Sequence, residues 1–241
     1  RLNPGQVVHW MAAPKQTLDA MVQTRAAFLT DYQNAAYARR FEALVSQVRR
    51  AEEALGGGAA AAKPNANTLP LTRAVARYAF KLMAYKDEYE VARLHTDPTF
   101  LSAIQAQFEG DFTLHYHLAP PLLSPQNADG VLHKRRFGPW MQTAFRLLAP
   151  LKVLRGGPLD VFGYAAERRT ERALVREYEQ AILSILPKLT LANRDVAVAF
   201  ARVPEHIRGY GPIKTRHLQA ARVKWAEQLA RFDQAGPATH L

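Results

Sequence analysis

The segment that most constrains the fold is residues 80–94, where apolar side chains recur at a helical period. Leu82, Tyr85 and Tyr89 fall on one side of such a helix, and their apolar neighbours widen this side into a broad band. A helix with so wide an apolar band must be enclosed by other helices. We therefore predict a central helix over residues 70–94 in an α-rich core. The charged residues expected on its solvated side are Lys86, Asp87, Glu88, Glu90 and Arg93.

The remaining helical patterns complete a predominantly α-helical α+β fold. Two helices are expected within residues 17–55, with Thr17 as the N-cap of the first and a break near Thr30 and Asp31. Pro70 is expected in the first turn of the central helix, where its missing N–H costs nothing. Further helices are predicted over residues 98–108, 140–148, 165–186, 190–203 and 212–232.

A change of period after residue 111 predicts a small antiparallel β-hairpin. Apolar and polar residues alternate over residues 112–118, which is typical of a half-buried strand, and residues 131–137 can return as its partner. Two strands alone are marginally stable, so we expect the hairpin to pack against helices.

Glycine and proline clusters suggest the domain organisation. Residues 17–233 are predicted to form one helical domain, interrupted by a flexible linker at about 56–69 that begins at a Gly triplet. Residues 1–16 read as the tail of a preceding domain or a linker, and residues 234–241 as a disordered tail.

Composition restricts the chemistry. The chain has 32 Lys and Arg against 21 Asp and Glu, a net charge of +11, which favours an anionic cofactor, an acidic partner or nucleic acid. It has no cysteine, which excludes disulfides, zinc-thiolate sites and thiolate-held iron–sulfur clusters within it. Since no apolar run approaches the roughly 20 residues of a membrane span, and no signal-peptide pattern is present, we expect a cytoplasmic protein without a membrane partner.

The basic run that ends the second strand offers the first candidate site. Lys134, Arg135 and Arg136 could bind phosphate groups or an acidic neighbouring domain, because guanidinium groups pair with both in a bidentate manner. His115 and His117 share a face of the first strand and could ligate a metal together with His133. We favour contact with a partner or solvent for the two histidines, and predict no metal site.

Two other readings stay open. On a helix Lys86 and Glu90 would be neighbours at i and i+4, which suits a surface ion pair or a catalytic Lys–carboxylate pair. The net charge also permits a basic helical module that binds nucleic acid or another anionic ligand. Nucleic acid is the weaker choice, because no aromatic residues interleave with basic ones as in an RNA-binding strand.

Beyond periodicity, seven blocks along the chain resemble, in order, one known family: the C-terminal domain of the fused bacterial indolepyruvate:ferredoxin oxidoreductases. The resemblance covers roughly Leu18 to Phe232. The blocks are Phe28 to Tyr37, Leu82 to Leu94, Gln107 to Asp111, His117 to Leu122, Lys134 to Trp140, Phe162 to Arg169 and Ile207 to Gly211.

The resemblance implies a part of a 2-oxoacid:ferredoxin oxidoreductase. Such enzymes oxidatively decarboxylate arylpyruvates on thiamine diphosphate and pass electrons through 4Fe–4S clusters to ferredoxin, with coenzyme A as acyl acceptor. The motifs for these groups lie in preceding domains of the family, including a γ-type catalytic domain that residues 1–16 would end, so this chain is expected to hold no cofactor and no catalytic residue. Its expected partners are the catalytic domains of the same enzyme, in a homo-oligomer. Arg208 is a further candidate contact, although Pro212 stands where relatives often have histidine.

Overall fold

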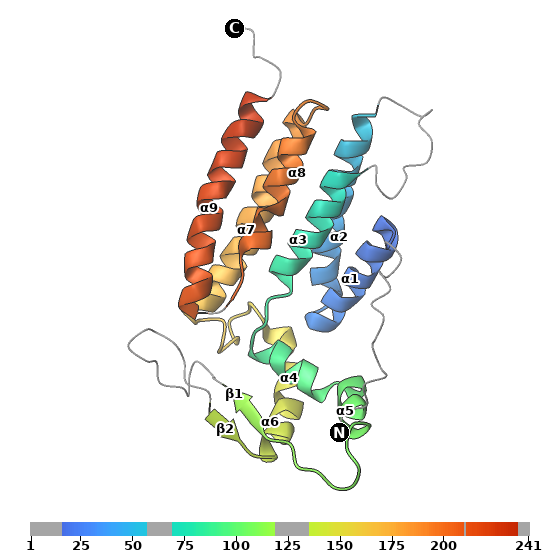
Figure 1. The fold of residues 1–241 in the computed structure, drawn as a ribbon, viewed down its shortest axis with the longest axis vertical. Coiled ribbons are helices and arrows are strands. Elements are labelled where there is room, and N and C mark those ends of the chain that lie inside the picture. The colour runs from blue at the N-terminus through green and yellow to red at the C-terminus, as the bar shows by residue number, and fades with distance from the viewer. Residues whose placement is uncertain (1–15, 57–68, 119–134, 210, 236–241) are drawn as a thin grey trace, which may run out of the picture.

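The computed structural model describes residues 16–56, 69–118, 135–209 and 211–235, and it places a helical bundle above a smaller lobe (Figure 1). The bundle consists of α1 (Leu18–Tyr32), α2 (Ala35–Ala54), α3 (Pro70–Met83), α7 (Ala166–Ile185), α8 (Arg194–Arg202) and α9 (Gly211–Gln234). The lobe consists of α4 (Glu88–Thr96), α5 (Pro98–Gln105), β1 (Tyr116–Leu118), β2 (Arg135–Phe137), α6 (Trp140–Leu148) and the 3-10 helix η1 (Ala149–Leu154). Two short 3-10 helices, η2 (Leu186–Lys188) and η3 (Val203–His206), follow α7 and α8. The predicted class, predominantly helical with one antiparallel hairpin, is confirmed.

Helix α3 is the centre of the bundle, as predicted for the first half of the 70–94 segment. It packs against α1, α2, α7 and α8, and Leu71, Val75 and Ala76 on it are fully buried. Pro70 occupies its first turn, as expected. Burial of this broad apolar surface is the main force that holds the bundle together.

The prediction of one helix through residue 94 is wrong, because the chain turns between Met83 and Glu88. Ala84 leaves the helical conformation, with φ −94° and ψ 48°. Two tyrosine hydroxyl groups bind backbone carbonyls at this turn: Tyr37 donates to the carbonyl of Met83 at 3.1 Å, and Tyr32 donates to that of Tyr85 at 2.9 Å. Asp87 then begins α4 as its N-cap and accepts from the N–H of Glu90 at 2.9 Å.

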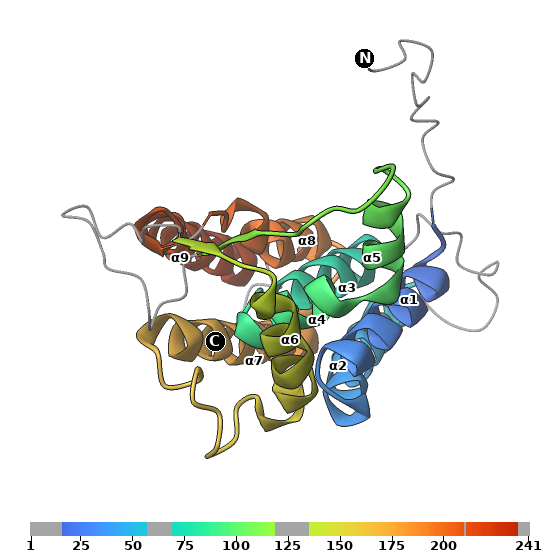
Figure 2. The ribbon, with the colours of Figure 1, turned by 90° about the horizontal axis from the view of Figure 1, so that it is seen from below.

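The lobe has a small hydrophobic core of its own. Ala92 of α4, Tyr116 of β1, and Met141 and Phe145 of α6 are buried together. The strands pair antiparallel, with Tyr116 opposite Phe137 and His117 opposite Arg136. Figure 2 shows the hairpin beside α6 and away from α1 and α2.

The first strand is shorter than the predicted 112–118, and the second is described over Arg135–Phe137 of the predicted 131–137. The ladder begins at Tyr116, which pairs with Phe137, the last residue of β2. Phe112 contacts Phe108, with ring centroids 5.2 Å apart. Residues 131–134 lie outside the described part, as do the predicted N-terminal tail through residue 15, residues 57–68 of the predicted linker and the tail from residue 236.

Helix boundaries follow their capping residues. Thr17 caps α1 as predicted, but α1 continues past Thr30 and Asp31 and ends at Tyr32, because Asn34 supplies the cap of α2. Helix α6 has the predicted bounds, whereas α8 begins only at Arg194. Among the described residues, no helix has the length and apolar character needed to cross a bilayer.

Candidate functional site

The predicted basic hairpin exists as an exposed polar face in the lobe. His115, His117, Arg135 and Arg136 are exposed, while Tyr116 between the two histidines is buried, so the strand alternates as expected. An Arg136 Nη2 atom lies 3.0 Å from Nε2 of His115. The face can present two guanidinium groups and two imidazoles to an acidic group. Lys134 and His133 lie outside the described residues.

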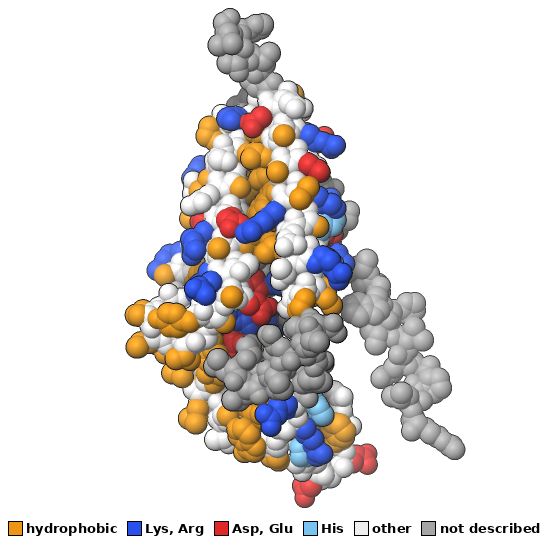
Figure 3. Space-filling model, turned by 90° about the vertical axis from the view of Figure 1, so that its left-hand side faces the viewer, with side chains coloured by type: hydrophobic (Ala, Val, Ile, Leu, Met, Phe, Trp, Pro, Cys, Tyr) orange, Lys and Arg blue, Asp and Glu red, His pale blue; other side chains and the backbone are white. Residues whose placement is uncertain are grey.

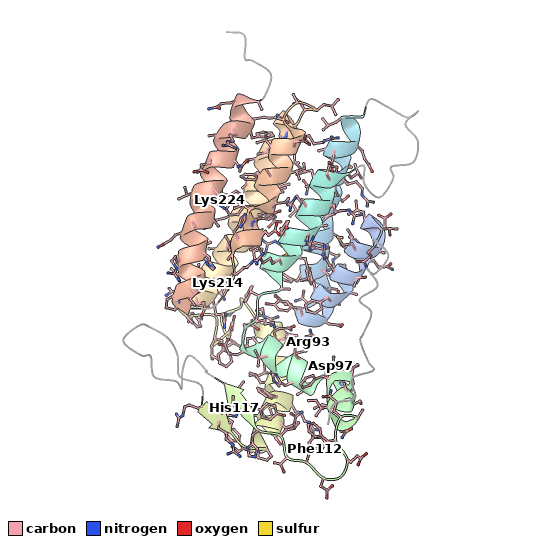
Figure 4. The ribbon with its side chains drawn as sticks, viewed as in Figure 1. Arg93, Asp97, Phe112, His117, Lys214 and Lys224 are labelled. Atoms are coloured by element: carbon pink, nitrogen blue, oxygen red, sulfur yellow. The ribbon has the colours of Figure 1, made fainter. Side chains whose placement is uncertain are left out.

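The other predicted contact residue belongs to a different part of the molecule. Arg208 follows η3 beside the bundle, and its Nε donates to the carbonyl of Glu205 at 3.1 Å. In Figure 4, His117 marks the hairpin in the lobe and Lys214 marks the first turns of α9 at the lower end of the bundle. Among the described residues, no contact therefore joins Arg208 to the hairpin.

No cluster of three or more His, Asp or Glu side chains suited to a metal occurs in the described ranges. The pair His115 and His117 gains no third ligand there, and the proposed third ligand, His133, is outside those ranges. The metal alternative therefore has no support among the residues that can be placed.

The structure contains a second set of charged residues, which is buried and was not predicted from the sequence. Asp87 and Arg155 form an ion pair at 2.5 Å with side chains only 3% and 2% exposed. Arg155 lies over the ring of Tyr32, 3.7 Å from its centroid, and also donates to the Tyr32 carbonyl. Burial alone lowers the pKa of Arg155, but the hydrogen bonds and charge of Asp87 outweigh it and raise that pKa.

A buried aspartate fixes the loop that follows η1. Asp160, 3% exposed, accepts from the N–H groups of Gly156 at 2.7 Å and Gly163 at 2.9 Å, and from the hydroxyl of Tyr89 at 3.2 Å. Arg172 of α7 lies 3.6 Å from the same carboxylate. We call residues 155–165, held in this way, the 155–165 loop.

One further pair connects the lobe to the bundle, and another joins two bundle helices at this level. Glu88 of α4 accepts two hydrogen bonds of 3.2 Å from Arg168 of α7, and both side chains are mostly buried. Lys214 of α9 pairs with Glu171 of α7. Together with Asp87–Arg155 and Asp160–Arg172, these pairs form what we call the charged junction.

The charged junction can fix the angle between lobe and bundle, and its groups are already occupied. Each carboxylate in it faces a cation or several N–H donors, so none is left as a free base. The same holds for Glu90, which is 2% exposed and accepts from Arg93 at 2.8 Å, while Lys86 is exposed. We predicted that Asp87 and Glu90 lie on the surface and that Lys86 pairs with Glu90. Both predictions are wrong, because they assume one continuous helix and the chain turns between α3 and α4.

One sequence signal could have located the junction. Asp87 followed by Glu90 three residues later has the spacing of a capping box, which marks the start of a helix. Nothing local marks Arg155 as the partner of Asp87, since 68 residues separate them.

Replacement of Gly163 tests the rigidity of the 155–165 loop. A Cβ at this position would lie 2.3 Å from Oδ2 of Asp160 and 2.9 Å from Nη1 of Arg172. We expect Gly163→Ala to lower the free energy of unfolding by about 1–3 kcal/mol, as overpacking does. Gly138→Ala is the control, because its Cβ meets only the Trp140 ring at 3.4 Å. Urea unfolding of both variants measures the difference, and equal stabilities would contradict the account.

The buried tyrosines predict a loss of stability at high pH. Burial, followed by the charge of Asp160 and its hydrogen bond, raises the pKa of Tyr89 to about 12, and burial also raises the pKa of Tyr32. The folded protein thus keeps phenolic protons that the unfolded chain loses near pH 10. The free energy of unfolding should be unaffected by these groups below pH ~10 and should fall between pH ~10 and ~12. Urea unfolding across this range, with phenolate absorbance, checks the expectation; titration of all tyrosines near pH 10 without unfolding would refute it.

Comparison with known proteins gives one match. No curated protein and no solved structure is significantly similar to the chain. Residues 18–227 match a family described as a family of unknown function (DUF6537). The match covers most of the chain, including α1 to α8, the charged junction and much of α9. The chain therefore belongs to the DUF6537 family.

Proposed function

We propose that this chain is the non-catalytic, C-terminal helical domain of a cytoplasmic indolepyruvate (arylpyruvate) ferredoxin oxidoreductase. The observation that carries the proposal is the ordered set of seven blocks between Phe28 and Gly211 that resembles this domain of the fused enzymes. The region that matches the DUF6537 family, residues 18–227, is nearly the same region.

The proposed role is assembly and support of the catalytic domains. Thiamine diphosphate, 4Fe–4S clusters and coenzyme A would be held by those domains, and ferredoxin would be the electron acceptor of the homo-oligomeric enzyme. A supporting role is consistent with the charged junction, whose carboxylates are committed to internal ion pairs. It is also consistent with the absence of cysteine, which leaves the chain without a cluster ligand.

The test compares the complete natural protein with the isolated 241-residue chain. Both are assayed for arylpyruvate oxidation coupled to ferredoxin or methyl viologen reduction, with thiamine diphosphate and coenzyme A supplied. We expect turnover by the complete protein and none by the isolated chain. Turnover by the isolated chain would contradict the assigned division of labour, and an inactive complete protein would contradict the reaction.

A further inference from the structure

One stretch of the described chain exposes several large apolar side chains to solvent. Within 18 residues of α6, η1 and the 155–165 loop, six such side chains are between 44% and 71% exposed. They are Leu147, Leu151, Val153, Leu159, Val161 and Tyr164, and we call them the 147–164 surface. Figure 3 shows hydrophobic side chains on the lower half of one face of the molecule, as well as along the bundle above.

The backbone of this surface is held rigidly from inside. Asp160 is buried and fixes Gly156 and Gly163, while its two neighbours, Leu159 and Val161, are 69% and 64% exposed. Phe162 turns inward, with its ring 5.3 Å from that of Tyr89. The loop thus presents alternate apolar side chains outward in a fixed conformation, which lowers the entropic cost of binding a partner.

Charge around the surface favours one kind of occupant. Between residues 135 and 165 the exposed or half-exposed charged residues are all cationic: Arg135, Arg136, Arg146 and Lys152. Two acidic residues lie next to this stretch: Asp31, whose carbonyl accepts from Lys152, and the half-exposed Glu167 in the first turn of α7. Cationic side chains therefore outnumber acidic ones around the surface. The acidic residue in this stretch, Asp160, is buried against Arg172, and Arg155 is buried against Asp87. A partner that matches this arrangement has apolar side chains at its centre and carboxylates at its edge.

The same charges argue against two other occupants. A second copy placed symmetrically would bring two predominantly cationic edges together, which is unfavourable. Nucleic acid would match the cations, but interfaces with it are polar and wet, and exposed Leu and Val side chains gain little there.

We infer that the 147–164 surface, with its cationic edge, docks on an acidic-edged apolar surface of another protein domain. The identification of this domain as the catalytic part of the same enzyme rests on the proposed function. The motivating observation is the combination of rigid apolar exposure and a surplus of cationic side chains in one stretch of the chain.

Photocrosslinking in the complete natural protein tests the inference with a matched pair of sites. p-Benzoylphenylalanine replaces Val161, which is 64% exposed on this surface, or Val223, which is 59% exposed on α9. We expect position 161 to crosslink in high yield to a polypeptide segment outside residues 16–235 that is rich in Asp and Glu. Position 223 should give a much lower yield.

Several results would overturn the inference. They are equal yields at the two positions, crosslinks that join two 147–164 surfaces, or crosslinks to nucleic acid. Arylpyruvate-dependent viologen reduction by the same preparation separates the two proposals. Activity without a position-161 crosslink rejects the docking surface alone, whereas the crosslink without activity rejects the enzyme assignment and keeps the docking surface.

A substitution pair gives an independent readout. Val161→Asp places a carboxylate in the apolar contact, whereas Val223→Asp makes the same change elsewhere at similar exposure. Hydrogen exchange of residues 155–165 in the complete protein should rise by about tenfold or more in Val161→Asp, as loss of a central contact worth more than 1.4 kcal/mol implies. An unchanged exchange rate relative to Val223→Asp would contradict docking.

Discussion

Replacing Arg155 with Ala is expected to lower the free energy of unfolding by about 3–5 kcal/mol, because it leaves the carboxylate of Asp87 buried without its cation. Asp87 is 3% exposed, and Arg155 supplies it with hydrogen bonds of 2.5 and 2.7 Å. The substitution also removes the guanidinium from the Tyr32 ring, 3.7 Å away. Urea unfolding followed by circular dichroism measures the loss.

Two controls identify the buried charge as the cause. The Lys188–Asp233 pair has side chains 65% and 50% exposed, so Asp233→Ala should cost less than about 1 kcal/mol. The double variant Asp87→Leu with Arg155→Met removes both charges, and it should lose less stability than the sum of the two single variants. A small effect of Arg155→Ala, or strict additivity in the double variant, would contradict the account of the charged junction.

Replacing Glu52 with Ala is expected to cost about 3 kcal/mol, because it leaves buried donors at the start of α3 without an acceptor. Glu52 lies in α2, is 4% exposed, and accepts from the N–H groups of Leu71 at 2.9 Å and Thr72 at 2.8 Å. It also accepts from the Thr72 hydroxyl at 2.7 Å. This carboxylate therefore caps α3, whose own N-cap residue, Leu69, has no side-chain acceptor.

Glu53 provides the matched control, since it is the next residue and is exposed. Glu53→Ala should change the free energy of unfolding by less than about 0.5 kcal/mol. Glu52→Gln keeps one carbonyl acceptor and should lie between Glu52→Ala and the parent protein. Equal effects of the Glu52 and Glu53 substitutions would show that the cap is unimportant.

Periodicity was sufficient to predict the helical class, the central position of α3 and the hairpin. These features depend on apolar spacing, which is local: α6 has its predicted bounds, and Thr17 and Pro70 occupy their predicted places. The break after Met83 was not predicted, because the apolar band of residues 80–94 continues across it. The hydroxyl groups that end α3 come from Tyr32 and Tyr37, which are distant in sequence.

One part of the candidate site could be predicted from local sequence patterns, and another part could not. The exposed alternation of His115 and His117 around Tyr116 could be predicted from a two-residue period. The charged junction could not, because three of its four pairs join residues 43 to 80 positions apart. Asp87 and Glu90 were expected on the solvent-exposed side of a helix. Both are buried, because Arg155 and Arg93 compensate their charges.

The central claim is that this domain supports a reaction centre held elsewhere in the same enzyme. The most direct measurement is the cofactor content of the natural protein, purified natively and identified by peptides of this chain. We predict one polypeptide much larger than 27.0 kDa that contains bound thiamine diphosphate, iron and acid-labile sulfide. A natural protein of about the mass of this chain, free of all three, would contradict the claim.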